Sequence, residues 1–207
     1  MTDIPIILAS HSPRRKQLLE QIDLAFTVEP SGIHEEKHNG QSPEQYASEL
    51  ASAKSAAVSK QFPDALVIGA DTIVVHKDQI LGKPADRDDA YRILSCLSGQ
   101  KHKVITAVSI RSLHHDISEL FHEATIVSFV ELGDSDIYEY IDTYKPYDKA
   151  GSYGIQDRFS VWIDHIEGCF FNVMGFPLSA FYERYTSIMN CIENNRPNTV
   201  GGKDLSR

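Results

Sequence analysis

Three short segments of the chain combine residue types that could do chemistry. The first, residues 10–15, reads Ser-His-Ser-Pro-Arg-Arg and directly follows an apolar run. Two hydroxyls, two guanidiniums and the free backbone N–H groups of a helix start would together form a site for an anion such as a phosphate. The sequence has no GxxxxGK[ST] pattern, so this segment is not a P-loop. An exposed basic turn is the alternative interpretation.

The second segment places a carboxylate, Asp71, inside the apolar run of residues 65–75, with Thr72 next to it. A buried carboxylate has to be paired, protonated or bound to a metal ion, because a bare buried charge is too costly. An aspartate that caps a turn at a strand end is the alternative, but the three apolar residues after Thr72 argue against it. Lys83, in a Gly-Lys-Pro turn downstream, could approach the same pocket.

The third segment, residues 148–156, reads Asp-Lys-Ala-Gly-Ser-Tyr-Gly-Ile-Gln. Its small residues would let the backbone approach a ligand closely. Lys149 can meet a phosphate, and the amide of Gln156 can read the edge of a base with one donor and one acceptor. Taken together, the three segments indicate cations for phosphates, carboxylates for a metal ion and a water, and an amide for a base.

A set of alternating strands and helices would position these segments. An apolar strand at residues 4–9 leads into a helix at 14–22, with Ser12 as the N-cap and Pro13 at the first helical position. Further strands are expected at residues 25–29, 65–75, 104–110, 124–132 and 161–166, and further helices at 43–60, 87–97, 134–140 and 177–192. The strands at 104–110 and 124–132 are expected to pair antiparallel. The predicted fold class is therefore α/β, with a mixed central sheet and flanking helices.

Composition limits the domain count and the class of partner. The chain has 207 residues, which predicts one domain over residues 1–193, followed by a polar tail at 194–207 that we expect to be disordered. With 20 Lys and Arg against 29 Asp and Glu, the formal net charge is −9. This charge disfavours binding to nucleic acid or to an anionic membrane, although a local basic pocket stays compatible with it.

The cysteines and the N-terminus point to the cytoplasm. Cys96, Cys169 and Cys191 are widely spaced and form neither a CxxC zinc pattern nor a disulfide framework. The N-terminal residues lack the basic and apolar regions of a signal peptide. No apolar run is long enough to span a membrane.

Six motifs together resemble one known family. The segments LASHSPRRKQLL, GADTIVV, LGKP, LSGQKHKVITAV, DKAGSYGIQ and NVMGFP occur in the order and spacing of the Maf family of nucleoside triphosphate pyrophosphatases. The resemblance covers residues 4–190. It implies a fold related to the inosine triphosphate pyrophosphatases, with two lobes around a cleft. It also implies hydrolysis at the α-phosphate, which yields a nucleoside monophosphate and pyrophosphate.

The resemblance also implies roles for individual residues. Asp71 matches the proton acceptor of the family, and Glu35 with Asp71 matches its ligands for a divalent metal cation, Mg²⁺ or Mn²⁺. The phosphate-side positions of the family correspond here to Ser10, Arg15, Lys54, Lys83 and Lys149. The positions that distinguish the branch acting on dTTP and UTP correspond to Arg14, Thr72 and Gln156. Whether Asp71 acts as a base or mainly holds the metal stays open.

Several alternatives remain at this point. The 7-methyl-GTP branch of the same family differs at the three specificity positions. A non-catalytic nucleotide-binding regulator of cell division would not need Asp71, Glu35 and Lys83 together. A nucleic-acid binder that uses Arg14 and Arg15 is disfavoured by the net charge of −9. A homodimer is suggested by family analogy only.

This chain departs from the family pattern after Gln156. It reads Asp-Arg-Phe-Ser at residues 157–160, where relatives usually place glycines. We expect this change to make the loop on the substrate side stiffer.

Overall fold

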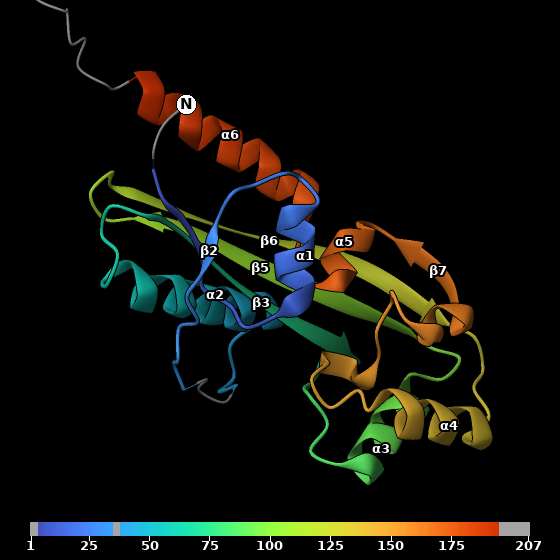
Figure 1. The fold of residues 1–207 in the computed structure, drawn as a ribbon. Helices are drawn as coiled ribbons and strands as arrows, with labels where there is room; N and C mark the ends of the chain where they lie inside the picture. Colours follow the sequence, from blue (N-terminus) through green and yellow to red (C-terminus); the bar gives the residue numbers. More distant parts are fainter. Residues whose placement is uncertain (1–3, 35–37, 195–207) are drawn as a thin grey trace, which may run out of the picture.

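The computed structural model describes residues 4–34 and 38–194, which form a sheet covered by helices (Figure 1). The strands are β1 (Ile6–Leu8), β2 (Thr27–Val28), β3 (Leu66–His76), β4 (Gln79–Leu81), β5 (Lys101–Ser112), β6 (Ile117–Phe129) and β7 (Ile163–Glu167). The α-helices are α1 (Pro13–Glu20), α2 (Pro43–Ser59), α3 (Arg87–Leu97), α4 (Asp134–Tyr144), α5 (Phe170–Met174) and α6 (Leu178–Asn194). Two 3₁₀ turns, η1 (Ala150–Ser152) and η2 (Arg158–Trp162), complete the description.

The sheet is mixed, which confirms the predicted fold class. Its strand order is β2-β1-β3-β5-β6-β7, and β4 pairs with β3 outside this path. The β1–β2 and β1–β3 pairs are parallel, whereas β3, β5, β6 and β7 follow one another in antiparallel pairs. The antiparallel pairing expected for the two long strands is that of β5 and β6.

Strand β3 lies inside the sheet and pairs with β1, β4 and β5. It pairs with β1 at residues 66–68 and with β4 at residues 74–76, both along the same edge. The opposite edge pairs with β5 along residues 67–75. Among the described residues, positions 69–73 therefore have a strand partner on the β5 side only. This interruption leaves an opening in the sheet beside Asp71 and Thr72.

Helices cover the two faces of the sheet unequally (Figure 1). Helix α2 packs on one face, where Ala47 and Ala51 meet Ile73 and Ile105. Helices α1 and α6 cover the other face at one end, and α3 and α4 cover it at the far end. The apolar core under α1 and α6 contains Ile68 of β3, and the core under α3 and α4 contains Val74 of the same strand. Strand β3 therefore contributes to both cores.

A glycine lets α2 approach β3 unusually closely. A Cβ atom at Gly69 would lie 2.4 Å from the Ala51 carbonyl oxygen and 2.7 Å from the Ser55 backbone nitrogen. Only a residue without a side chain fits between these backbones. Because side chains alternate along a strand, Asp71 points to the same face as Gly69 and therefore toward α2.

Local sequence signals account for the helix starts. The Ser12 side chain accepts a hydrogen bond from the Arg15 backbone N–H at 3.4 Å, with Pro13 at the first helical position. Ser42 and Gln45 form a reciprocal capping box at the start of α2. These bonds satisfy backbone donors that the first helical turn leaves unpaired.

Several short elements were not predicted. Residues 79–81 form β4, residues 170–174 form α5, and residues 150–152 and 158–162 are 3₁₀ turns. Each is shorter than the stretch of residues over which a helical or strand pattern of apolar residues can be recognised. The predicted tail lies outside the described residues except for Asn194, which ends α6. Among the described residues, no helix has the length and apolar character needed to cross a membrane.

Candidate active site

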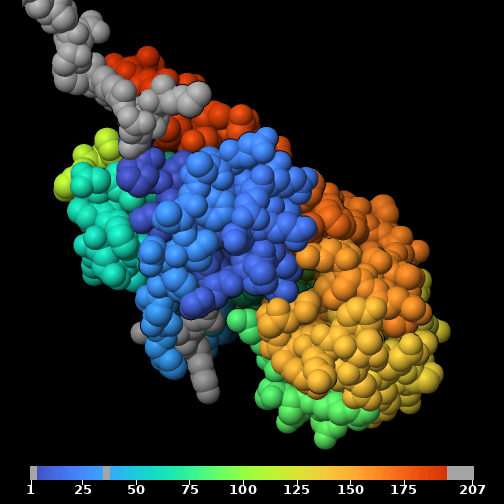
Figure 2. All heavy atoms as spheres, viewed as in Figure 1, coloured from blue at the N-terminus to red at the C-terminus, as the bar shows by residue number. Residues whose placement is uncertain are grey.

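A pocket of about 630 Å³ opens at the interruption in the sheet. In Figure 2 a hollow separates the N-terminal part of the chain from the lobe that contains α3 and α4. Nearly all of the site residues expected from the sequence line this pocket: Ser10, Arg14, Arg15, Lys54, Asp71, Thr72, Lys83, Lys149 and Gln156. Glu35, the remaining expected site residue, lies outside the described residues.

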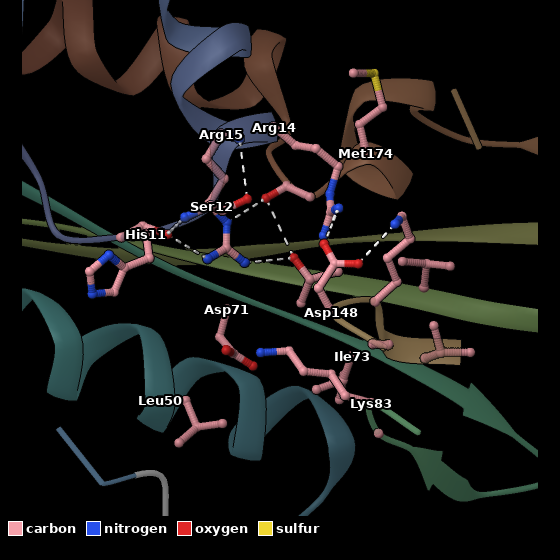
Figure 3. Close-up of a pocket in the computed structure, with 18 of the residues that line it drawn as sticks. His11, Ser12, Arg14, Arg15, Leu50, Asp71, Ile73, Lys83, Asp148 and Met174 are labelled. Atoms are coloured by element: carbon pink, nitrogen blue, oxygen red, sulfur yellow. Dashed lines mark hydrogen bonds and ion pairs between the residues drawn. The ribbon is translucent and has the colours of Figure 1, made fainter. Parts of the chain in front are cut away.

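Asp71 forms a buried ion pair with Lys54. The Lys54 Nζ atom lies 2.6 Å from Asp71 Oδ1, and the two residues are only 9% and 8% exposed. Of the three outcomes expected for this carboxylate, which were pairing, protonation or metal binding, the structure shows pairing. In Figure 3 the Lys83 side chain also extends toward the Asp71 carboxylate. Two ammonium groups thus approach one carboxylate from α2 and from the turn after β4.

Arg15 is held by oxygen acceptors from three parts of the chain. Its Nη1 donates to Ser10 Oγ at 3.2 Å, its Nη2 to Thr72 Oγ1 at 3.0 Å and its Nε to the Gly175 carbonyl at 3.0 Å. Gly175 has φ of 113°, a backbone conformation that favours glycine. Arg15 as a residue is 9% exposed and lines the pocket, and these three hydrogen bonds orient its guanidinium.

Asp71 and Thr72 are neighbours in β3 but belong to opposite faces of the sheet. Asp71 contacts Lys54 on α2, whereas Thr72 contacts Arg15 on α1. The pocket reaches both side chains because β3 has no strand partner on this edge at residues 69–73 among the described residues. One open stretch of β3 thus exposes a carboxylate and a guanidinium to the same ligand.

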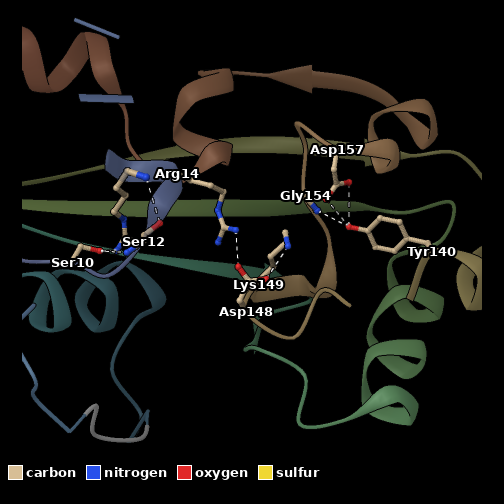
Figure 4. A network of polar contacts seen from close by, with 9 residues as sticks. Ser10, Ser12, Arg14, Tyr140, Asp148, Lys149, Gly154 and Asp157 are labelled. Carbon is tan, nitrogen blue, oxygen red and sulfur yellow. Dashed lines mark hydrogen bonds and ion pairs between the residues drawn. The ribbon is translucent and has the colours of Figure 1, made fainter. Parts of the chain in front are cut away.

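Asp148 joins two pocket cations at the pocket mouth (Figure 4). Arg14 Nη1 donates to Asp148 Oδ2 at 2.9 Å, and Lys149 Nζ donates to Asp148 Oδ1 at 2.8 Å. Burial by itself would raise the pKa of Asp148, but the hydrogen bonds from Lys149 and Arg14 outweigh it and lower the pKa. The carboxylate therefore stays ionised and compensates both cations.

The loop that carries Gln156 is anchored by Tyr140. The Gly154 backbone N–H donates to the Tyr140 hydroxyl at 3.1 Å, and this hydroxyl donates to Asp157 Oδ2 at 3.1 Å (Figure 4). Burial, followed by the charge of Asp157, raises the pKa of Tyr140, so the hydroxyl keeps its proton. Asp157 also accepts from the Phe159 backbone N–H at 2.9 Å. These bonds fix the backbone on both sides of Gln156.

The donor set of the pocket is compatible with a magnesium-type cation. Among the described residues, no cluster of three or more His, Cys, Asp or Glu side chains could hold a metal ion. However, Mg²⁺ in nucleotide-binding sites is usually bound by one or two carboxylates together with the phosphates of the substrate. The pocket-facing carboxylate of Asp71 supplies one such ligand. Glu35, the second predicted ligand, is not described.

Sequence reasoning assigned no role to three groups that the structure places at or behind the site. Asp148 had no predicted role within residues 148–156, although an aspartate next to Lys149 in the sequence could have suggested that the two side chains pair. Tyr140 lies on α4, whose sequence carries no hint that its hydroxyl meets Gly154. Thr106 lies in the strand expected at residues 104–110, and its hydroxyl bonds to Thr72 at 3.0 Å.

Comparison with known proteins finds one family and many relatives. A family model described as "Maf-like protein" matches residues 5–188. The dTTP/UTP pyrophosphatase of Geobacillus sp. (strain WCH70) is 49% identical over 174 residues, which cover 84% of this chain and 92% of that protein. The dTTP/UTP pyrophosphatase of Koribacter versatilis (strain Ellin345) is 46% identical over 177 residues, which cover 86% and 91%. Among solved structures, the Staphylococcus aureus Ham1 protein matches with a TM-score of 0.42 at 14% identity, covering 60% of this chain and 71% of that one.

Proposed function

Because this chain belongs to the Maf family, we propose that it is a nucleoside triphosphate pyrophosphatase that hydrolyses dTTP and UTP to the monophosphate and pyrophosphate. Several relatives with this name are 42–49% identical to it over most of their length. The observation that carries the proposal is the composition of the pocket. Among the described residues, two carboxylates and five cationic side chains line it in a protein of net charge −9: Asp71 and Asp148 with Arg14, Arg15, Lys54, Lys83 and Lys149.

The charge of the pocket suits a triphosphate. A nucleoside triphosphate carries roughly four negative charges, and guanidiniums bind phosphate oxygens in pairs. Arg15 is already oriented by Ser10, Thr72 and Gly175, so phosphate binding would not have to order its side chain. A divalent cation held by Asp71 and the phosphates would neutralise further charge and polarise the attacked phosphate.

Asp71 is proposed as the group that orients the attacking water and accepts its proton. Lys54 holds one carboxylate oxygen of Asp71 at 2.6 Å, which fixes the direction of the other. Water held by that oxygen would attack the α-phosphate in line with the leaving pyrophosphate. Arg15 and Lys83 would stabilise the charge that develops on the phosphate oxygens.

Gln156 is proposed to read the base. A uracil or thymine ring presents a carbonyl beside an N–H, and the amide of Gln156 offers the matching donor and acceptor. Cytosine would mismatch at one of these bonds, which costs about 1–3 kcal/mol, or roughly one to two decades in rate. Tyr140 and Asp157 support this role because they fix the loop on either side of Gln156.

We also propose that the protein acts in the cytoplasm. Cys96, Cys169 and Cys191 are all free thiols in the structure. Free cysteines are typical of a reducing compartment.

One assay tests the proposal. Pyrophosphate release would be measured from dTTP, UTP, CTP and 7-methyl-GTP, each with Mg²⁺ and with Mn²⁺. We expect release from dTTP and UTP at comparable rates and at least tenfold slower release from the other two. Faster release from 7-methyl-GTP would assign the chain to the other branch. Binding of dTTP without release from any nucleotide would support a non-catalytic regulator instead.

A further inference from the structure

Thr106 on β5 is completely buried and does not line the pocket, yet it is linked to the pocket by hydrogen bonds. Its register partner in the sheet is Thr72 on β3. The two hydroxyl oxygens lie 3.0 Å apart, and Thr72 Oγ1 in turn accepts from Arg15 Nη2 at 3.0 Å. A short chain of bonds therefore connects β5 to the guanidinium in the pocket.

The direction of each hydrogen bond in this chain can be assigned. Thr106 donates its only hydroxyl hydrogen to the Asn172 carbonyl oxygen at 2.9 Å. It can therefore only accept at the contact with Thr72, so Thr72 must donate there. With its hydrogen directed to Thr106, Thr72 presents its lone pairs to Arg15. The Asn172 carbonyl of α5 thus sets the direction of the Thr106 hydroxyl, and Thr72 donates to Thr106 at 3.0 Å in preference to the Gly175 carbonyl at 3.4 Å.

Without Thr106, the Thr72 hydroxyl would turn to another acceptor. The Gly175 carbonyl oxygen lies 3.4 Å from Thr72 Oγ1 and already accepts from Arg15 Nε at 3.0 Å. Thr72 and Arg15 would then compete for one oxygen. The competition would weaken the bond that holds Nη2 and the bond that holds Nε, so the guanidinium would lose the orientation that these contacts impose.

We propose that Thr106 is a positioning residue for phosphate binding, which holds Arg15 in its binding orientation through Thr72. This inference rests on the proposed function, since it assumes that Arg15 binds substrate phosphate. Thr106 itself never touches the ligand. Its contribution is to fix the direction of the Thr72 hydroxyl from a position that is itself completely buried.

Three substitutions separate this role from simple support of the fold. Thr106→Val keeps the shape but removes the hydroxyl, and Thr106→Ser restores the hydroxyl. Thr125→Val is the matched control, because Thr125 is equally buried, lies on the adjacent strand and accepts a hydrogen bond from Asn172 Nδ2. Within the part of the chain that the structure describes, its hydroxyl bonds to α5 and its N-cap and not to Thr72 or Arg15. Unfolding in urea would show how much stability each variant loses.

For Thr106→Val we expect the KM for dTTP to rise about tenfold, the ratio that one hydrogen bond of ordinary net strength supplies, with kcat within about twofold. Thr106→Ser should restore the KM to within about threefold, and Thr125→Val should leave it unchanged. Equal KM values for the two valine variants would overturn the proposal.

A double-mutant cycle with Arg15→Lys tests whether the effect passes through Arg15. Lysine lacks the fork that contacts Thr72, so adding Thr106→Val to Arg15→Lys should raise the KM by less than about twofold. A full tenfold rise in that background would overturn the proposal. Calorimetric titration with dTTP gives the same comparison without turnover. If the unsubstituted chain released no pyrophosphate, the proposed function would be refuted. The double-mutant cycle measured by calorimetric titration would still show whether Thr106 affects dTTP binding through Arg15.

Discussion

Lys54 Nζ lies 2.6 Å from Asp71 Oδ1 in a buried ion pair between α2 and β3. The pair exists because Gly69, two residues before Asp71, allows the backbone of α2 to contact the strand. A carboxylate in this environment is restrained in direction by its partner. That restraint also fixes the direction of the second carboxylate oxygen, on which we propose that the attacking water is held.

Replacing Asp71 should abolish turnover but not binding. Asp71→Asn keeps the shape and removes the proton acceptor, so we expect pyrophosphate release from dTTP to fall by about 100-fold or more. Calorimetric titration should still detect dTTP, since the cations remain. Asp116→Asn, at an exposed loop position, is the matched control and should leave turnover unchanged. Near-normal turnover of Asp71→Asn would show that another group activates the water.

Adding a methyl group at Gly69 should separate α2 from β3. Because the new Cβ would meet backbone atoms of Ala51 and Ser55, Gly69→Ala should lower the free energy of unfolding by about 1–3 kcal/mol. It should also reduce kcat for dTTP, because Lys54 moves with the helix. Gly82→Ala is the control for stability, since a Cβ there meets nothing within 4 Å. Equal stability of the two variants in urea would contradict this account of the close approach.

Removing the charge of Asp148 should strengthen substrate binding. In Asp148→Asn, Arg14 and Lys149 lose an anionic partner at 2.9 and 2.8 Å, so their charges become available to phosphate. We expect the KM for dTTP to fall about two- to fivefold at low ionic strength, and the difference to shrink as salt is added. Asp142→Asn, which breaks an ion pair with Arg87 away from the pocket, should have no such effect. A higher KM in Asp148→Asn would mean that Asp148 orients the two cations instead.

His102 should make the fold sensitive to acid. Its Nε2 lies 2.9 Å from the Tyr153 hydroxyl, and burial, with a smaller effect of His76, lowers the pKa of His102 to about 3. Since the unfolded chain takes up the proton near its ordinary pKa of 6.5, stability is fully present above that pH and is lost as the pH falls from 6.5 toward 3. The loss amounts to at most about 1.4 kcal/mol per pH unit.

Substituting His102 tests this assignment. His102→Gln should show a smaller decrease in unfolding free energy between pH 7 and pH 4.5 than the unsubstituted chain, by about 2–3 kcal/mol in urea titrations. His115→Gln, at an exposed position, should leave the pH dependence as it is. Identical pH dependence of His102→Gln and the unsubstituted chain would place the acid-sensitive group elsewhere.

Much of the frame could be predicted because its signals are local. Ser12 and Ser42 begin helices through side-chain hydrogen bonds to residues three positions away. The apolar run around Asp71 is long enough to be recognised as a strand from its sequence alone. The boundaries of β5 and β6 were less accurate, since their polar ends continue the hairpin beyond the apolar pattern. Helix α5, Phe170–Met174, is too short for its apolar residues to show the repeat by which a helix is recognised in a sequence.

The site residues were predicted largely through family motifs, and their mutual contacts were not. Nothing in the sequence pairs Lys54 with Asp71, or Arg14 with Asp148, which is 134 positions away. Such pairs depend on how closely two elements pack, and a single glycine decides that distance for α2. Thr106 was missed because a buried threonine in a strand usually packs without a directional role.

Strand β3 is continuous beneath both cores, whereas most of the pocket residues lie on segments that connect the strands and helices. Only Asp71 and Thr72 among the pocket residues that we assign come from the strand, whereas Arg14, Lys83 and Gln156 come from a helix start and two loops. If these residues contact the nucleotide as we propose, exchange of their segments would alter which nucleotide is accepted, while the pairing of β3 and the position of Asp71 stay unchanged. Two of the three predicted specificity positions, Arg14 and Gln156, can thus change independently of β3, whereas the third, Thr72, lies on the same strand as Asp71. We expect segment grafting between relatives to shift specificity without refolding the sheet.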